Sequence, residues 1–268
     1  MCLAVQHDYL LSQRRACQLL GVSRSRSYYQ PRVRDDASAI ALMQAHIHDN
    51  PGHGFGQLHD QTLQRNGIGK TRGWRLYCQL KMNLPRRGKH RLPERVRDPL
   101  AVPTQCIDTW SGDFMSDALW SGRRFRTFNV NDDHNRECLR IEIGTSLPSA
   151  RVIEVLDQLK QIRGLPKRLR LDNGPEFISH ALKQWAKENQ VELVHIQPGK
   201  PTQNAFIERF NRTFRTEVLD RYVFETLDQV QRMSDDWRHR YNHQRTHRAL
   251  GKMTPIQYAV AQSQKPLL

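Results

Sequence analysis

The sequence has few cysteines, no long apolar run and too few acidic residues to balance its basic ones. No apolar stretch approaches the roughly 18 residues that a membrane-spanning helix needs, which argues against a transmembrane protein. The N-terminus lacks the basic region and apolar stretch of a secretory signal peptide. The five cysteines include no Cys-x-x-Cys motif, and the twelve histidines form no standard zinc cluster with them. We therefore expect a cytoplasmic protein with reduced thiols.

The charge is strongly positive and unevenly distributed. The chain has 268 residues with 42 Lys+Arg against 27 Asp+Glu, a net charge of +15. Residues 1–100 hold 17 of the basic and 7 of the acidic residues, a local net of +10, which leaves +5 for the rest. Such an excess is typical of a protein that binds a polyanion, most simply nucleic acid. The alternative is a solvated basic surface that serves solubility.

The first thirty residues have the pattern of a helix-turn-helix. Residues 12–20 form an apolar-periodic stretch, and Gly21 follows as a helix stop. Ser23 can cap a second, short helix that carries Arg24 and Arg26. A helix, a glycine turn and a basic second helix indicate a DNA-binding motif, with these two arginines on DNA. Any short helical hairpin has a similar outline, so the pattern alone is weak.

Three more helices are expected before residue 80, which completes a helical region over 1–80. Two of them are predicted over 36–49 and 56–65. The third is predicted from Thr71 to Leu80, with Thr71 as its cap and with an apolar face made by Trp74, Tyr77 and Cys78. Gly73 lies inside this third helix and costs it about 1 kcal/mol relative to Ala.

A basic linker is expected over 81–101. Residues 81–97 hold seven Lys/Arg and two prolines, a composition typical of an extended segment. We expect Arg86, Arg87 and Lys89 to lie on a phosphate backbone. A disordered tether between domains is the alternative, and both can hold together.

The pattern changes to a mixed α/β sheet over the core, 102–222. Strands are predicted first, then helices alternate with strands, and a C-terminal helix and tail occupy 223–268. The expected strands are 107–116, 123–131, 136–144, 168–171 and 191–196. The expected helices are one that starts at Pro148, then 176–188, 202–219 and 228–241.

Three acidic residues have positions that suit chemistry. Asp113 falls inside the first strand of the core, where a charge is costly unless it is paired or holds a metal. Asp172 ends a strand before a sharp Asn-Gly-Pro turn, at the edge where α/β sheets bind ligands. Glu208 borders the buried stripe of the long helix, with Arg212 and Arg215 further along its own face. A carboxylate followed by two arginines suits a metal-bound phosphodiester in DNA.

Each of the three has an ordinary structural alternative. Asp172 can form a turn, Glu208 can pair with Arg212 at i,i+4, and Asp113 can be a bulge residue. Neighbouring acids can also replace a member of the trio: Asp108, Asp117, Asp132, Asp133 and Glu176.

Three segments of the sequence then carry a family resemblance. Residues 171–177 read Leu-Asp-Asn-Gly-Pro-Glu-Phe, and 197–215 read Gln-Pro-Gly-Lys-Pro-Thr-Gln-Asn-Ala-Phe-Ile-Glu-Arg-Phe-Asn-Arg-Thr-Phe-Arg. The tail at 241–251 reads Tyr-Asn-His-Gln-Arg-Thr-His-Arg-Ala-Leu-Gly, with Thr-Pro at 254–255. From about residue 12 to 260 the chain resembles bacterial insertion-sequence transposases with a retroviral-integrase-like core. It is most similar to the second-frame product of the two-frame family.

The resemblance implies a ribonuclease-H-like fold and a metal-dependent active site. Asp113, Asp172 and Glu208 would be the catalytic carboxylates and would hold two Mg²⁺ (or Mn²⁺) ions, for which hard oxygen ligands are suited. The DNA contacts expected within the matching motif are Lys200, Asn204, Arg212 and Arg215. Gly73, Gly112, Ala205 and Thr246 depart from the residues usual in the family.

The activity implied is cleavage at the ends of an insertion element and strand transfer into target DNA. The expected partners are DNA, further copies of the chain on DNA, and a separate upstream-frame protein with its own helix-turn-helix. Two alternatives stay open: a related nuclease that cuts without joining, and a DNA-binding regulator with a relict catalytic core.

Overall fold

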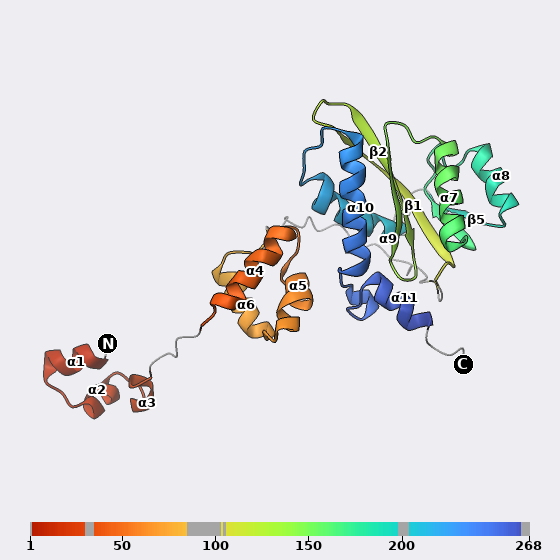
Figure 1. Cartoon of the computed structure of the whole chain (residues 1–268). Coiled ribbons are helices and arrows are strands. Elements are labelled where there is room, and N and C mark those ends of the chain that lie inside the picture. Colours follow the sequence, from red (N-terminus) through yellow and green to blue (C-terminus); the bar gives the residue numbers. More distant parts are fainter. Residues whose placement is uncertain (1, 30–34, 85–102, 104–105, 198–203, 264–268) are drawn as a thin grey trace. The chain divides into compact units, whose positions relative to one another are not determined.

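The computed structural model describes residues 2–29, 35–84, 103, 106–197 and 204–263 (Figure 1). Internal contacts divide the chain into two compact units, Met1–Ile40 and Ala41–Leu268. The finer division at 80, 101 and 222 stays a prediction, and most of the expected linker lies outside the described residues. None of the helices in the described ranges is long and apolar enough to cross a bilayer.

The first unit contains the two helices expected from the sequence. They are α2 (Gln13–Leu19) and α3 (Arg24–Ser27), and a further helix, α1 (Cys2–Tyr9), precedes them. The Ser12 hydroxyl accepts from the Arg15 N–H, and Ser23 caps α3 in the same way. Gly21 between them has φ of +62°, a conformation that glycine adopts without strain. Arg24 and Arg26 are exposed, as a DNA contact requires, and their role stays a prediction.

The second unit begins with a small helical module. Its helices are α4 (Ala37–Asp49, which starts in the first unit), α5 (Phe55–Leu58), a π-helix (η1, His59–Leu63), a 3₁₀ turn (η2, Gln64–Asn66) and α6 (Lys70–Gln79). The helices expected over 36–49 and 56–65 are therefore confirmed, the second with an irregular hydrogen-bond pattern.

The helix expected from Thr71 is present, but its cap and its buried face were predicted wrongly. The N-cap is Gly69, and the buried residues are Gly73, Leu76 and Tyr77. Trp74 and Cys78 are exposed. The physical reason is close helix packing: a Cβ on Gly73 would lie 2.7 Å from Leu63 Cδ1. The missing side chain lets α6 approach its neighbour along the face that contains Gly73.

The core is a five-stranded mixed sheet in the order β3-β2-β1-β4-β5. β1, β2 and β3 are antiparallel neighbours, and β4 and β5 run parallel to β1. The bounds are β1 Thr109–Ala118, β2 Arg124–Asp132, β3 Cys138–Gly144, β4 Arg168–Leu171 and β5 Glu192–His195. All five expected strands are confirmed, with their ends shifted by no more than two residues.

Helices follow the strands in the expected order, with differences at their ends. They are α7 (Ser149–Arg163), α8 (His180–Glu188), α9 (Ala205–Phe214), a π-helix (η4, Arg215–Leu219), α10 (Leu227–His243), a 3₁₀ turn (η5, Arg248–Leu250) and α11 (Pro255–Ser263). The helix expected from 176 begins later because Ser179 caps it, accepting from Leu182 N–H. The expected start at Thr202 lies outside the described residues, and α11 was not anticipated.

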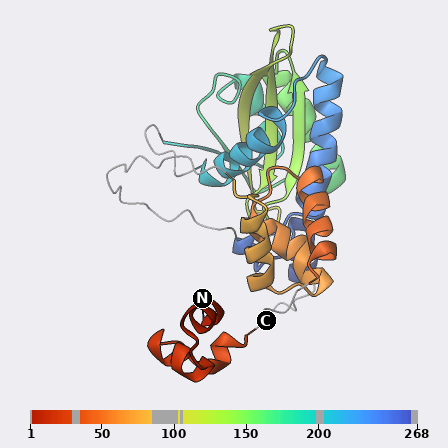
Figure 2. The ribbon, with the colours of Figure 1, turned by 90° about the vertical axis from the view of Figure 1, so that its left-hand side faces the viewer.

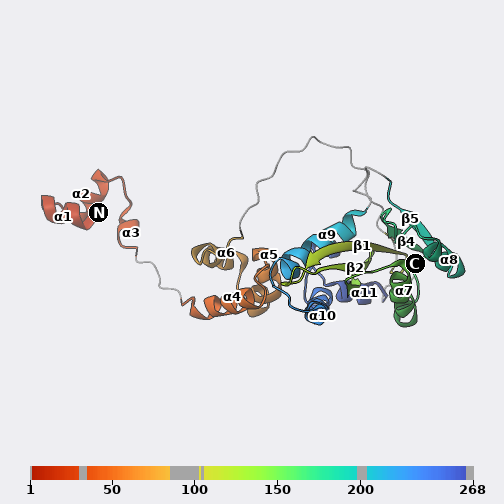
Figure 3. The same ribbon diagram turned by 90° about the horizontal axis from the view of Figure 1, so that it is seen from above.

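Two apolar clusters cover the two sides of the sheet. One joins β1, β2 and β4 to α7 and α8, and it includes Trp110, Phe128 and Leu156. The other joins the sheet to α9 and α10, and it includes Phe210 and Trp237. Figure 3 shows α9 and α7 on opposite sides of the strands. Because side chains alternate along a strand, β1, β2 and β3 each supply residues to both clusters.

β1 packs most closely at Gly112, one residue before Asp113. A Cβ on Gly112 would lie 2.8 Å from Leu171 Cδ2 and 3.1 Å from Phe128 Cε2. Gly112 therefore belongs to the α7 side of the sheet. By alternation, Asp113 points to the α9 side. The unusual glycine thus gives a neighbouring leucine and phenylalanine the room that a larger side chain would occupy.

The edge strand β3 is covered by α10, which runs lengthwise beside the sheet in both Figure 1 and Figure 2. Near its C-terminal end, the buried Asn242 makes two hydrogen bonds to the backbone of Cys138. Its Oδ1 accepts from the Cys138 N–H at 2.9 Å, and its Nδ2 donates to the Cys138 carbonyl at 2.9 Å. The β2–β3 register shifts between Val130 and Asn131, next to this point. The Asn242 side chain therefore satisfies both backbone groups of Cys138, the first residue of the edge strand β3.

Candidate active site

Parallel pairing of β1 and β4 brings Asp113 and Asp172 together. Thr109, Trp110 and Ser111 face Arg168, Leu169 and Arg170 in register. Two positions further along each chain, Asp113 and Asp172 occupy neighbouring places at the carboxyl edge of β4. Asp113 lies inside a continuous β1–β2 register, so it is not a bulge residue. The sheet thus assembles two carboxylates that are far apart in the sequence.

α9 packs over β1 and β2 and brings a third carboxylate to the same region. Its buried stripe contains Ile207, Phe210 and Phe214, as the sequence predicts, and Glu208 lies exposed beside it. No ion pair joins Glu208 to Arg212 among the described residues, so the i,i+4 alternative is not realised. Glu208 acts electrostatically on Asp113, which places it on the Asp113 side of α9.

Asp113 has a strongly perturbed pKa. Burial and the negative charges of Asp172 and Glu208 together raise it to about 6, against hydrogen bonds that lower it. Two of these bonds come from the Phe114 N–H at 2.9 Å and from Asn211 Nδ2 at 2.7 Å. Carboxylates close enough to raise the pKa of Asp113 favour a bound cation, because a cation relieves the repulsion. Within the described ranges, no three metal-ligating side chains are already arranged around a common point.

The Asp172 side chain also stabilises the turn in which it lies. Its Oδ1 accepts from the Gly174 N–H at 2.8 Å, and its carbonyl lies 3.1 Å from His195 Nδ1. Asp172 therefore does form a turn, as the structural alternative expected. Oδ2 has no hydrogen bond among the described residues and stays available to a ligand.

The five competing acids are all engaged elsewhere. Asp133 is fully buried, accepts from Ser111 at 2.6 Å and pairs with Arg170 at 2.7 Å. Asp132 accepts the N–H groups of Ile107 and His134. The remaining pairs are Asp108–Arg168, Asp117–Arg215 and Glu176–Arg126. Asp132 is satisfied by backbone N–H groups and the other four acids by cations, whereas Asp113, Asp172 and Glu208 have no cationic partner in the described chain.

The residues expected to contact DNA occupy different settings. Arg212 is exposed, whereas Arg215 pairs with Asp117 and donates to the Ser116 carbonyl at 2.8 Å. Asn204 is buried at the start of α9, and its Oδ1 has no hydrogen-bond partner in the described chain. The others expected on DNA, Arg86, Arg87, Lys89 and Lys200, lie outside the described residues.

Two asparagines belong to the site and were missed from the sequence. Asn129 Nδ2 donates to Asn211 Oδ1 at 2.7 Å, and Asn211 in turn donates to Asp113. Asn129 is also the direct partner of Asp113 in the β1–β2 register. The position of Asn211, three residues after Glu208 on one helix, is a signal that helical spacing offers. The position of Asn129 depends on the strand register.

The comparisons with known proteins agree with the fold. Models described as "Integrase core domain" match residues 103–201 and 189–255. The simian T-cell lymphotropic virus intasome, solved in complex with PP2A regulatory subunit B56 gamma, matches with a TM-score of 0.50 at 16% identity, over 85% of this chain and 77% of that chain. The fold is therefore ribonuclease-H-like, and the class is that of integrase-type enzymes of DNA recombination.

Two relatives then define the family. An uncharacterized 31.7 kDa protein of insertion element IS407 from Burkholderia multivorans is 38% identical over 96% of this chain and 93% of the relative. An uncharacterized 39.2 kDa protein of insertion element IS476 from Xanthomonas euvesicatoria is 36% identical over 93% and 72%. The chain belongs to the insertion-sequence transposases with an integrase-like catalytic core.

Proposed function

We propose that the chain cleaves DNA at the ends of its insertion element and joins the freed strands to target DNA, with Asp113, Asp172 and Glu208 as the catalytic carboxylates. The observation that carries this proposal is the parallel β1–β4 pairing. It makes two carboxylates neighbours under the helix that holds the third, while every competing acid has another partner.

The residues fit a divalent metal. Carboxylate oxygens are the ligands that Mg²⁺ and Mn²⁺ prefer, and the raised pKa of Asp113 reflects burial first and the negative charge of Asp172 and Glu208 second. Asp113 and Asp172 would hold the metal, and Glu208 would complete the set. When bound, a pair of such ions activates the attacking oxygen and stabilises the leaving oxygen.

The chain's own residues then have distinct roles. Asn211 fixes the Asp113 carboxylate through its 2.7 Å hydrogen bond. Arg212 provides an exposed positive charge one turn beyond Glu208, where it can contact a DNA phosphate. Cleavage and joining are the same displacement at phosphorus, because an oxygen of water or of a DNA 3′-hydroxyl attacks while another ester oxygen leaves. One site therefore serves both steps.

The proposed reaction implies that the chain acts together with partners. Two element ends have to be held at once, so we propose that at least two copies of the chain act on DNA together. The simian virus relative was solved as an intasome. We also propose that the upstream-frame protein assists recognition of the element ends.

The decisive experiment is a cleavage and strand-transfer assay on the flanking inverted repeats, with and without Mg²⁺ and the upstream protein. Asp172→Asn should lower metal-dependent cleavage by about 1,000-fold or more, because it removes a charged ligand, and should leave DNA binding unchanged. Asp228→Asn, on the exposed face of α10, is the matched control and should keep full activity.

The outcomes separate the three functions. Cleavage without joining would identify a nuclease, and DNA binding without any cleavage would identify a regulator with a relict core. Full cleavage by both Asp172→Asn and Glu208→Gln proteins would show that the carboxylates are assigned wrongly.

A second test concerns the hydrogen bond that holds Asp113. Asn211→Ala removes a bond that lowers the pKa of Asp113, so this pKa should rise above its present value of about 6. Protonated Asp113 cannot bind a metal ion. The acid limb of the cleavage pH profile should therefore move to higher pH, with roughly tenfold lower activity near pH 6.5. Thr216→Ala, in the π-helix η4 that follows α9, is the control, and an unshifted profile for Asn211→Ala would rule out this role.

A further inference from the structure

A cleft lies along the flank of α9 that is opposite to the flank of Glu208. At 100° per residue, Phe206, Arg209 and Thr213 occupy one flank of the helix, while Glu208 and Arg212 occupy the other. The first flank lines a cleft of about 640 Å³, together with the β2–β3 connection, the helical module near Gln57 and the tail after α10. This volume lies within the range of small-molecule sites in proteins.

Three buried polar atoms in the wall of this cleft have no hydrogen-bond partner in the described chain. They are Asn131 Oδ1, Arg136 Nη1 and His247 Nε2. The Asn131 residue is only 3% exposed, so solvent does not readily satisfy it. Buried polar groups are nearly always hydrogen-bonded, and a cluster of exceptions around one cavity points to a polar occupant.

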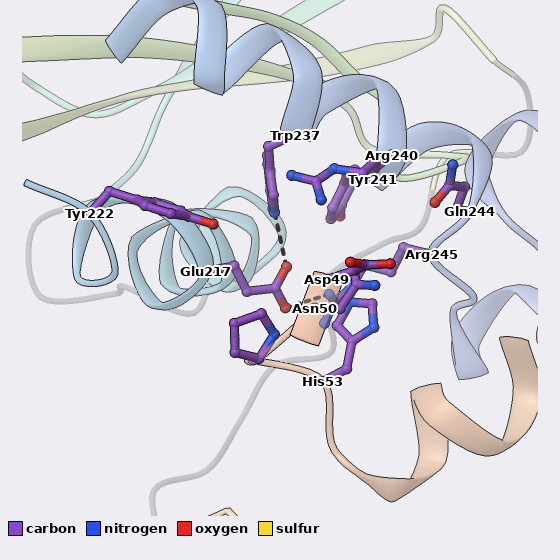
Figure 4. A pocket seen from close by; sticks show the side chains of 12 residues that line it. Asp49, Asn50, His53, Glu217, Tyr222, Trp237, Arg240, Tyr241, Gln244 and Arg245 are labelled. Atoms are coloured by element: carbon purple, nitrogen blue, oxygen red, sulfur yellow. Dashed lines mark hydrogen bonds and ion pairs between the residues drawn. The ribbon is translucent and has the colours of Figure 1, made fainter. Parts of the chain in front are cut away.

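The cleft also has excess positive charge. Arg209 and Arg248 are exposed at its rim, and neither has an ion pair within the described ranges. A third arginine, Arg245, is already held by Glu217 at 2.5 Å (Figure 4). The acids of the lining are also engaged: Asp60 by Lys252, Asp133 by Arg170, and Asp132 by two backbone N–H groups. Arg209 and Arg248 are therefore left at the rim for an anion.

Flat apolar surface completes the lining. The Arg136 guanidinium carbon lies 3.3 Å from the centre of the half-exposed Phe206 ring, and Phe210 and Tyr241 also line the cleft. Burial lowers the pKa of His247 to about 4, so its ring is neutral at pH 7 and Nε2 can donate or accept a hydrogen bond.

We propose that this cleft binds one nucleotide, with its phosphate on Arg209 and Arg248 and its base against Phe206. A phosphate needs cations, a base needs a flat apolar surface, and the edge of a base needs hydrogen-bond partners of the kind that Asn131, Arg136 and His247 offer. The nucleotide comes either from a DNA strand, which rests on the proposed function, or from the free pool. Both sources share the chemistry that the lining recognises.

Binding by the full chain tests the site. The probes are a fluorescein-labelled single-stranded octadeoxynucleotide and dATP, and the variant is Arg209→Gln/Arg248→Gln. Its affinity for the probe that occupies the cleft should fall about tenfold. For the oligonucleotide, the slope of log affinity against log salt should fall by about 0.7, since both arginines contact one phosphate and each single-strand phosphate contributes about 0.7. Both arginines are exposed, so folding should be unaffected.

The matched control removes two positive charges elsewhere, with Lys183→Gln/Arg232→Gln on α8 and α10. Weaker binding of the oligonucleotide alone assigns the site to a DNA strand, and weaker binding of dATP alone assigns it to a free nucleotide. Either result supports the cleft. An equal loss in the control, or no loss in the variant, overturns the proposal.

Cross-linking locates the base. An octanucleotide that contains 5-bromodeoxyuridine, irradiated with the full chain, should attach to the peptide that contains Phe206 or Tyr241, and cross-links confined to other peptides contradict the site. Asp172→Asn protein should give the same pattern. This variant separates the two proposals, since it removes cleavage and leaves the cleft intact.

Discussion

Asp113→Asn is expected to abolish cleavage and, at the same time, to stabilise the metal-free protein at neutral pH. In the folded chain the pKa of Asp113 is raised from 3.8 to about 6 by burial and by two neighbouring carboxylates. The protonated form is therefore the one that folding favours. Its contribution to stability is fully present below about pH 4 and is lost as pH rises through about 6. At pH 7 an uncharged amide avoids a cost on the order of 2 kcal/mol.

The neighbouring amides can accept the substitution. Asparagine at 113 would present an N–H₂ group to Asn211, which now donates there. Rotating the Asn211 amide would turn its oxygen to residue 113 and its N–H₂ to Asn129. The Asn129 Oδ1 has no partner in the described chain, so it can accept in turn. Asn129 and Asn211 would thus exchange their donor and acceptor groups. No new polar group between them would be left without a partner.

Calorimetry on the metal-free proteins measures this effect. The midpoint of unfolding should rise by about 5 °C at pH 7 and should be nearly unchanged at pH 4. Added Mg²⁺ should raise the midpoint of the original protein and not that of the variant. Asp228→Asn serves as the control for loss of a surface charge. A variant that unfolds at a lower temperature at pH 7 would show that Asp113 is satisfied by its surroundings as a carboxylate.

Asn242→Ala is expected to give the largest loss of stability. The side chain makes both of its hydrogen bonds to the backbone of Cys138, and residue 242 is only 4% exposed. Removing it leaves a buried N–H and a buried carbonyl without partners at the first residue of β3. Each unsatisfied group costs about 1–3 kcal/mol, so we expect a loss of about 3 kcal/mol.

Chemical denaturation checks this prediction. The urea midpoint should fall while the slope of the free energy of unfolding against urea stays the same, because the surface exposed on unfolding is unchanged. His243→Ala changes the next residue, which is exposed, and should have little effect. Equal stability of the Asn242→Ala and original proteins would show that another group pairs the Cys138 backbone.

Much of the fold could be predicted from local patterns, since the strands and most helices have clear apolar periodicity. Asp172 could be placed because a strand and a sharp turn adjoin it in the sequence. Features that depend on distant contacts could not. Gly73 weakens its helix by local propensity, yet the helix forms because the glycine fits against Leu63. The late start of α8 depends on Ser179, whose capping role no periodicity reveals.

The candidate site shows the same difference between residues found by local patterns and residues placed by distant contacts. Family motifs singled out Asp172 and Glu208, and Asp113 was singled out by its charge inside an expected strand. The 2.7 Å bond from Asn211 joins residues 98 positions apart, and the Glu176–Arg126 pair joins residues 50 apart. Such partners depend on the register of the finished sheet. The competing acids could therefore be set aside only once their cationic and backbone partners were visible.

The parallel β1–β4 pairing has a consequence for the timing of the chemistry during synthesis. β1, β4 and α9 leave the ribosome in that order, and the three proposed catalytic carboxylates come from these three elements. Parallel strands cannot pair until the crossover between them has folded. A nascent or truncated chain that ends before α9 therefore carries an incomplete set of carboxylates. The order of elements along the chain would thereby withhold the proposed cleavage activity until almost the whole core has been made.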